Sequence, residues 1–350
     1  MKQNSLYNII AGGVLALSAT ACTGAYEDIN RNPFEPDDLT ADDYALSSSM
    51  YNICNTVMSN DVNQYQFVES LMGCTLGGYF ADGNGNFTAS FSRYNPANGW
   101  SRVFMEANQN SIIPTLYTNI SMIEGYCETS GNPVPAAIAK VVKVAAMSRV
   151  TDCYGPIPYS KIGYDGNILT PYDSQQDVYY KFFEELGEAI EELNQNRGAQ
   201  LNPLIDDVYR GDVTKWIRFA NSLKLRLALR ISYADPAKAK QMAEEAVNPA
   251  NGGVIETVDA NATYKHYSNG GNPTYMSTVN YGNDSRPSAD LICYMNGYND
   301  PRRAEYFTTS GWTNADGSYM TDPAGNPLEY VGVRRGWETY AVSYTHLRAH

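Results

Sequence analysis

The segment SQQDVYYKFFEELGEAIEEL, residues 174–193, is the stretch that decides the fold class. Its apolar residues recur at every third or fourth position, which is the period of an α-helix with one buried face; they are Val178, Phe182, Leu186, Ala189, Ile190 and Leu193. Ser174 and Asp177 have the spacing of a capping box. The glutamates fall on the other side, where we expect them to face solvent: Glu184, Glu185, Glu188, Glu191 and Glu192. The segment predicts an amphipathic helix that must pack on a partner.

Other segments repeat this period. A second helix, beginning near Asp212, places Trp216, Ala220, Leu223 and Leu227 on one side. Its other side is basic, and we expect these cations to pair with acidic helices rather than with nucleic acid; they are Lys215, Arg218, Lys224, Arg226 and Arg230. Further helices are expected at 41–58, 102–127, 136–151 and 236–248. The segment 136–151 is almost continuously apolar and should therefore be central.

No long stretch alternates with a period of two, so the chain is expected to be mainly α. The helical segments are separated by long loops at 73–99, 153–172, 249–287 and 308–336. Loops of this length in a compact domain usually carry function.

The N-terminus has the features of an export signal. Lys2 precedes an apolar run at 9–17, which ends in the small residues Ser18-Ala19-Thr20-Ala21 before Cys22. The run is too short to cross about 30 Å of hydrocarbon as a helix. The ending is typical of a bacterial lipobox, although Ala19 stands where leucine is usual. We therefore expect 1–21 to be a lipoprotein signal peptide and Cys22 the lipid anchor; the alternative is an ordinary signal peptide with an incidental cysteine.

The composition restricts the partners. The formal net charge is −13, which disfavours binding to nucleic acid phosphates. The chain contains 28 tyrosines, and rings with a polar tip suit wet recognition surfaces such as those that stack on sugars. For most of these tyrosines the simpler expectation is that they cover a helical core.

Motifs for catalysis, metals and cofactors were sought and not found. The sequence has no G-x-S-x-G elbow, no P-loop and no C-x-x-C pair. A Ser-His-Asp arrangement would depend on His266, since His346 and His350 fall in an atypical tail. The segment 82–86 begins like a calcium loop, but Phe87 and Arg93 replace the required glycine and glutamate. We expect no enzyme activity, no metal and no cofactor, and we expect most of the cysteines other than Cys22 to be buried apolar residues.

Five local motifs now occur in order along the chain: YEDINRNP (26–33), TDCYGPIPYS (151–160), YDSQQDVY (172–179), GDVTKW with FANSLKLRLA (211–228), and NDPRR (299–303). Together they resemble the SusD/RagB-like outer-membrane lipoproteins of Bacteroidetes, over residues 22 to about 336. The resemblance implies helix pairs stacked like tetratricopeptide repeats, with a loop-rich part that holds the ligand. The sequence itself shows no 34-residue repeat.

The resemblance also implies a function and partners. Such proteins sit at the cell surface, capture oligosaccharides and deliver them to a SusC-like TonB-dependent transporter. The alternatives are a binder of peptides or another nutrient, and a structural helical-repeat lipoprotein with only protein partners. The expected domain is 22–342, incomplete at its C-terminus, followed by a non-native tail at 343–350.

Aromatic residues in the long loops are the candidate ligand-binding residues. Trp312 lies in a polar loop where burial is less expected, and Tyr79 and Phe80 follow Gly77-Gly78 in another. Trp100 precedes an apolar helix and has two open interpretations, a core residue or a stacking residue. All four are chosen by loop position, without a motif that assigns them a role.

Overall fold

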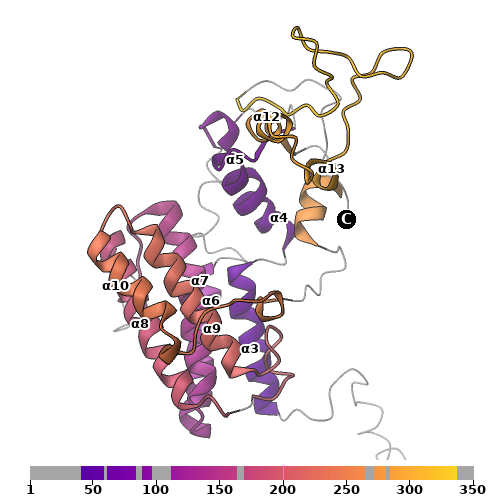
Figure 1. Ribbon diagram of the computed structural model, residues 1–350. Helices are drawn as coiled ribbons and strands as arrows, with labels where there is room; N and C mark the ends of the chain where they lie inside the picture. The colour runs from indigo at the N-terminus through magenta and orange to yellow at the C-terminus, as the bar shows by residue number, and fades with distance from the viewer. Residues whose placement is uncertain are drawn as a thin grey trace, which may run out of the picture. The chain divides into compact units, whose positions relative to one another are not determined.

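The computed structural model describes residues 41–58, 61–83, 89–96, 112–163, 169–199, 201–264, 272–280 and 284–336 (Figure 1). The chain divides into two compact units, residues 1–45 and 46–350. Of the first unit, the structure describes residues 41–45. Segment 1–21, Cys22, Trp100 and tail 343–350 lie outside the described residues.

Helices laid side by side form the body of the second unit (Figure 1). The longer helices of the described chain are α3 (Ala41–Val57), α6 (Ile112–Ser130), α7 (Val134–Tyr154), α8 (Gln175–Gln195), α9 (Val213–Arg230) and α10 (Pro236–Val247). From α6 to α10, each helix packs against the next one in sequence. Short connections at 131–133 and 231–235 join α6 to α7 and α9 to α10 as helix hairpins. The predicted mainly α, helix-pair scaffold is thus confirmed.

The helix predicted from residues 174–193 is α8. Ser174 caps it, because the Ser174 hydroxyl oxygen accepts a hydrogen bond from the Asp177 amide at 3.1 Å and its proton goes to the Asp177 carboxylate at 2.6 Å. The predicted apolar stripe is buried, with Phe182, Leu186 and Leu193 fully covered. The capping residues Ser174 and Asp177 therefore fix where α8 begins, and the apolar stripe fixes which side of α8 faces the helical body.

α7 is the central helix, as its apolar sequence predicts. Fourteen of its 21 residues are buried, including residues on every side of the helix. It packs against α6, α8 and α9. Gly155, with φ +73°, ends the helix in a conformation that a side chain would strain.

Two charged residues of the long helices are buried, and one of them, Glu185, was expected to face solvent. Glu185, expected on the solvent face of α8, is 6% exposed; its Oε1 atom lies 2.8 Å from Lys143 Nζ on α7, and its other oxygen accepts from the Tyr159 hydroxyl. Lys224, from the basic side of α9, is also buried, with its Nζ 2.8 Å from the Glu245 carboxylate on α10. The expectation that this side pairs with acidic groups is confirmed for Lys224, and for Arg230, whose Nη2 lies 2.9 Å from Asp152.

Four further predictions need correction. α7 spans Val134–Tyr154 rather than 136–151. α6 ends at Ser130 rather than at 127, and residues 97–111, which cover most of the first expected turns, lie outside the description. The expected loop at 249–287 includes short helical turns and strand β2. Cys153 and Cys293 are exposed, whereas cysteines were expected to be buried; all five described cysteines are free thiols.

A loop-rich part accompanies the helical body. Its first helical segment runs from α4 (Val62–Tyr65) through a π-helical stretch (Gln66–Gly73) to α5 (Cys74–Leu76). Strands β1 (Phe80–Asp82) and β2 (Ser285–Pro287), α11 (Pro273–Tyr275), α12 (Ala289–Gly297) and α13 (Arg303–Tyr306) complete it, with short helical turns at Phe91–Arg93, Pro249–Asn251, Val258–Ala260 and Met276–Asn280. The sequence analysis missed α12 and the segment 62–72.

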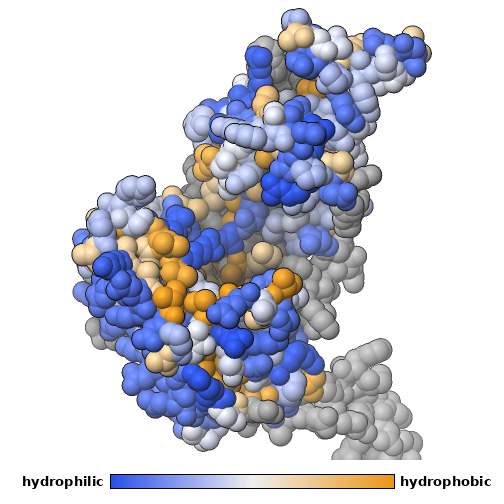
Figure 2. Space-filling model, viewed as in Figure 1, coloured by the Kyte–Doolittle hydropathy of each residue, from blue (hydrophilic) through white to orange (hydrophobic). Residues whose placement is uncertain are grey.

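The surface of the helical body is mostly hydrophilic. Figure 2 shows hydrophobic side chains gathered in a strip over α9, between larger hydrophilic areas. Leu229, near the end of α9, is 62% exposed. None of the helices in the described part of the chain has the length and apolar run that crossing a bilayer requires.

One buried carboxylate anchors the start of α9. Asp206, 2% exposed, accepts hydrogen bonds from four N–H donors at 2.7–3.1 Å: the amides of Val208, Tyr209 and Gly211, and the indole of Trp216. Gly211 has φ +86° and lies so close to the Leu201 carbonyl that no Cβ would fit. The turn into α9 is therefore held by one side chain.

Replacing this carboxylate should destabilise the protein. We expect Asp206→Ala to lower the free energy of unfolding by about 3 kcal/mol or more, because it leaves several buried donors without acceptors. Chemical denaturation measures the change. The matched control is Asp207→Ala, whose partner Arg210 lies 3.5 Å away at the surface and should cost less than about 1 kcal/mol. Equal losses in the two variants would contradict the anchoring role.

Candidate ligand-binding site

A short strand pair assembles the candidate site. β1 and β2 are antiparallel, with Phe80 opposite Pro287. Just beyond the ladder, the Ser288 amide donates to the Tyr79 carbonyl at 2.9 Å, and the Ser288 hydroxyl donates to the carbonyl of Gly78, 210 residues earlier. Gly78 has φ +80°, a conformation that glycine adopts without strain. These bonds place Tyr79 and Phe80 beside the beginning of α12.

α12 supplies the opposite wall. It begins at Ser288, whose hydroxyl oxygen accepts from the Leu291 amide at 3.1 Å. Positions 291, 294, 295 and 298 recur at intervals of three and four, so their side chains share one side of the helix. Asn299, with φ +47°, then turns the chain into α13, which brings Tyr306 and Phe307 to the same place.

Together these segments line a pocket of about 930 Å³, within the range of small-molecule sites. The lining is Cys74, Tyr79, Phe80, Leu291, Tyr294, Met295, Tyr298, Asp300, Arg302, Tyr306 and Phe307. Phe80, Met295 and Phe307 are buried and form an apolar floor. Four tyrosines are exposed around it: Tyr79, Tyr294, Tyr298 and Tyr306.

The tyrosine rings have an ordered geometry. Tyr294 and Tyr298, one helical turn apart, have ring planes within 3° of parallel and centroids 6.4 Å apart. They are 69% and 81% exposed, so their faces are open to a ligand. Large exposed aromatic surfaces of this kind mark sites where a partner covers them. The arrangement can hold a flat, partly apolar ligand whose edge is polar.

A salt bridge forms the charged part of the lining. The Arg302 guanidinium donates to both carboxylate oxygens of Asp300, at 2.5–3.2 Å. The hydrogen bond from Arg302 lowers the pKa of Asp300 to about 2. The neighbouring Arg303 does not join this pair: it donates to Asn296 at 2.8 Å and lies 4.5 Å from the Tyr330 ring centroid.

Two of the four candidates from the sequence therefore meet in one pocket. Tyr79 lies at its rim and Phe80 in its floor. Trp312 is half-buried and is not part of this lining; its amide donates to the Ser310 hydroxyl at 3.3 Å and its carbonyl accepts from Met320 at 2.9 Å. Trp100 lies outside the described residues.

Sequence reasoning missed Tyr294, Tyr298 and Tyr306. The signal was present: Leu291, Tyr294, Met295 and Tyr298 have helical spacing directly before the motif 299–303. A pattern of only four positions is too short to predict a helix by itself.

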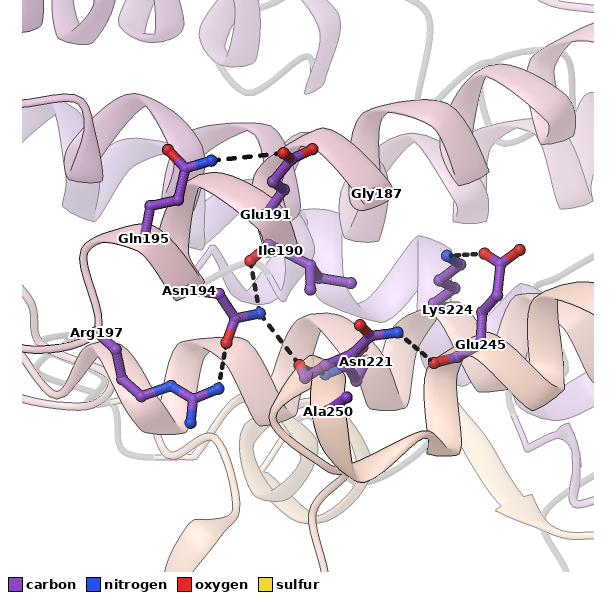
Figure 3. Close-up of a pocket in the computed structure, with 11 residues that line it drawn as sticks. Gly187, Ile190, Glu191, Asn194, Gln195, Arg197, Asn221, Lys224, Glu245 and Ala250 are labelled. Atoms are coloured by element: carbon purple, nitrogen blue, oxygen red, sulfur yellow. Dashed lines mark hydrogen bonds and ion pairs between the residues drawn. The ribbon is translucent and has the colours of Figure 1, made fainter.

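A second, polar pocket of about 670 Å³ lies between α8, α9, α10 and the turn at 249–253 (Figure 3). Its side chains largely bind one another. Lys224 pairs with Glu245, Arg197 with Asn194, and Gln195 with Glu191. Asn194 and Asn221 both donate to the Asn251 carbonyl, at 3.2 and 2.8 Å. These bonds hold the turn against the helices, so the aromatic pocket is the better candidate for a ligand. Among the described residues, no three His, Cys, Asp or Glu side chains gather as a metal site would need.

Comparison with known proteins assigns the family. The family model described as SusD-like, the SusD and RagB outer-membrane lipoproteins, matches residues 28–346. The chain belongs to this SusD-like family, as its motifs suggested. No curated protein matches the chain in sequence.

Solved structures agree with this assignment. A SusD homologue from Bacteroides uniformis is 50% identical with a TM-score of 0.77, and the match covers 87% of this chain and 61% of that one. A SusD homologue from Bacteroides thetaiotaomicron is 34% identical, with a TM-score of 0.73 and coverage of 87% and 60%. A chitin-binding SusD homologue from Flavobacterium johnsoniae is 29% identical, with a TM-score of 0.69 and coverage of 86% and 60%. The chain thus spans about 60% of the length of these relatives.

The floor and the rim of the pocket should differ in their effect on stability. Phe307, 3% exposed, packs in a buried cluster with Ile292, Met295 and Tyr330. We expect Phe307→Ala to cost about 3–5 kcal/mol of folding free energy, whereas Tyr298→Ala should change it by less than about 0.5 kcal/mol. Thermal and chemical unfolding of both variants measures this. A large loss for Tyr298→Ala would reassign that ring to the core.

Proposed function

We propose that this protein is a surface glycan-binding lipoprotein. It captures oligosaccharides in the aromatic pocket and delivers them to a SusC-like TonB-dependent transporter in the outer membrane. The observation that carries the proposal is the exposed tyrosine rim over an apolar floor. The C–H face of a sugar ring stacks on such rings while its hydroxyls reach polar groups at the edge.

The comparisons support the ligand class and the cellular site. The family is described as outer-membrane lipoproteins, and one relative with a similar fold binds chitin, a glycan. In this proposal the protein binds and releases its ligand unchanged. Two alternatives are a peptide-binding protein and a purely structural protein. Titration with free oligosaccharides tests both, because each alternative predicts that no oligosaccharide binds.

Removing a stacking ring should weaken binding without unfolding the protein. Stacking on aromatic side chains is worth about 1–3 kcal/mol per nucleic-acid base, and we expect somewhat less for a sugar. Tyr294→Ala and Tyr298→Ala should therefore each weaken oligosaccharide binding roughly tenfold, or about 1.4 kcal/mol. Isothermal titration calorimetry against neutral oligosaccharides measures the effect.

The matched control for this titration is Tyr233→Ala. Tyr233 follows α9, is 99% exposed and is not part of the pocket lining, so its loss should leave affinity unchanged. Equal losses in all three variants would argue against the pocket. Trp312→Ala and Trp100→Ala should be titrated in the same way, because the sequence predicts that both tryptophans stack on a ligand and this prediction is still untested.

The anchor is a separate prediction. Cys22→Ala should move the protein from the membrane fraction to the soluble fraction, because acyl chains supply membrane affinity through buried CH₂ groups. Fractionation of cells that express either form measures this, and the melting temperature of the released protein should match that of the wild type. Retention of Cys22→Ala in the membrane fraction would remove the lipobox interpretation.

A further inference from the structure

The charge of the aromatic pocket is decided by two residues. Among the eleven lining residues, Asp300 and Arg302 are the charged ones, and the others are aromatic or aliphatic side chains and one cysteine. Arg302 presents its guanidinium at the rim, where its side chain is 66% exposed. An exposed guanidinium beside exposed tyrosines would normally attract a ligand carboxylate, because it matches that group with two parallel hydrogen bonds.

In this pocket Asp300 already occupies the Nε and Nη2 side of the guanidinium. Arg302 Nε lies 2.9 and 3.2 Å from the two oxygens of Asp300, and Nη2 lies 2.5 Å from Oδ2. The Arg302 amide also donates to Asp300 Oδ1 at 2.9 Å, which fixes the carboxylate on the turn. Because the two side chains are two residues apart on a proline-containing turn, the carboxylate is held at a high effective concentration that a free ligand must overcome.

The pair is ionised at neutral pH. The hydrogen bond from Arg302 holds the pKa of Asp300 at about 2, and Arg302 remains protonated. The two charges therefore cancel. Arg302 is the one basic residue among the described residues of the lining, and an anionic sugar meets it as part of a neutral pair. The loss of the sugar's hydration over an apolar floor is therefore poorly offset.

We propose that Asp300 is a specificity-determining residue, which neutralises Arg302 and so makes the pocket select neutral over anionic oligosaccharides. This inference rests on the proposed function of the pocket. The net charge of −13 acts in the same direction, since it repels anionic ligands at long range.

The test is Asp300→Asn. Asparagine keeps a side-chain oxygen that can accept from the Arg302 amide, so the turn is preserved, while the negative charge that occupies the guanidinium is removed. The probes are neutral tetrasaccharides (cellotetraose, maltotetraose, mannotetraose and chitotetraose) and anionic ones (tetragalacturonate and tetramannuronate). Calorimetric titration of the full chain at low and high salt gives the affinity for each.

The wild type should bind at least one neutral probe and should bind the anionic probes at least tenfold more weakly. Asp300→Asn should raise the ratio of anionic-probe to neutral-probe affinity by about tenfold, since a freed guanidinium offers charge-assisted hydrogen bonds. That gain should shrink with added salt. The double variant Asp300→Asn with Arg302→Gln should lose it, which identifies Arg302 as the group that binds the anion.

Two outcomes would overturn the proposal. An unchanged preference in Asp300→Asn, with neutral binding intact, would remove Asp300 as the determinant while leaving the glycan-binding function in place. If the wild type binds an anionic probe as tightly as a neutral one, the pocket does not select neutral oligosaccharides, and the proposed role of Asp300 is likewise removed. If the wild type binds none of the probes, the proposed function fails and this inference fails with it, so the two failures are distinguishable.

Discussion

A helix that is apolar on every side must be covered on every side, and this constraint organises the helical body. α7 satisfies it by packing against α6, α8 and α9. Its neighbours need only one apolar face each, so their outer faces are free to carry charge. The charged side chains Glu185 on α8 and Lys224 on α9 are buried, and each has a partner of opposite charge on a neighbouring helix, Lys143 and Glu245. A buried charge without its partner would cost several kcal/mol, so each pair also favours one alignment of its two helices.

The pocket depends on a different kind of contact. No long helix of the body lines it. Instead, a three-residue strand pair and the bonds from Ser288 to Gly78 and Tyr79 bring two distant segments together. α12 then has two roles: Ile292 and Met295 pack with Phe307 and Tyr330, while Tyr294 and Tyr298 remain open. The helix that carries the two rings is thus held in place by a small core of its own.

The helical body could be predicted from the sequence because its signals are local. The stripe from Val178 to Leu193, the cap at Ser174 and the continuous apolar run of α7 each lie within one element. Glu185 was misjudged because burial of a charge depends on a partner from another helix, and periodicity within one helix carries no information about that partner.

The pocket could be predicted only in part, for the same reason. Tyr79 and Phe80 were found by their position after two glycines. Tyr294 and Tyr298 were missed because α12 is only nine residues long, so the helical spacing of its apolar residues is a weak signal. The segment 62–76 was missed because its π-helical stretch departs from the period of 3.6. The pairing of β1 with β2 has no local signature, since each strand is three residues long.

The strand pair also implies an order of assembly. Helices α6 to α10 meet as sequence neighbours, and contacts of this kind form early because little chain has to be closed into a loop. The pocket, by contrast, requires the segment after residue 284 to return to one before residue 83. A chain that emerges with its N-terminus first would therefore hold a packed helical body while Tyr79 and Phe80 still face water. In this order the candidate pocket is completed after the helical body has packed, because its two halves come from segments that are far apart in the chain.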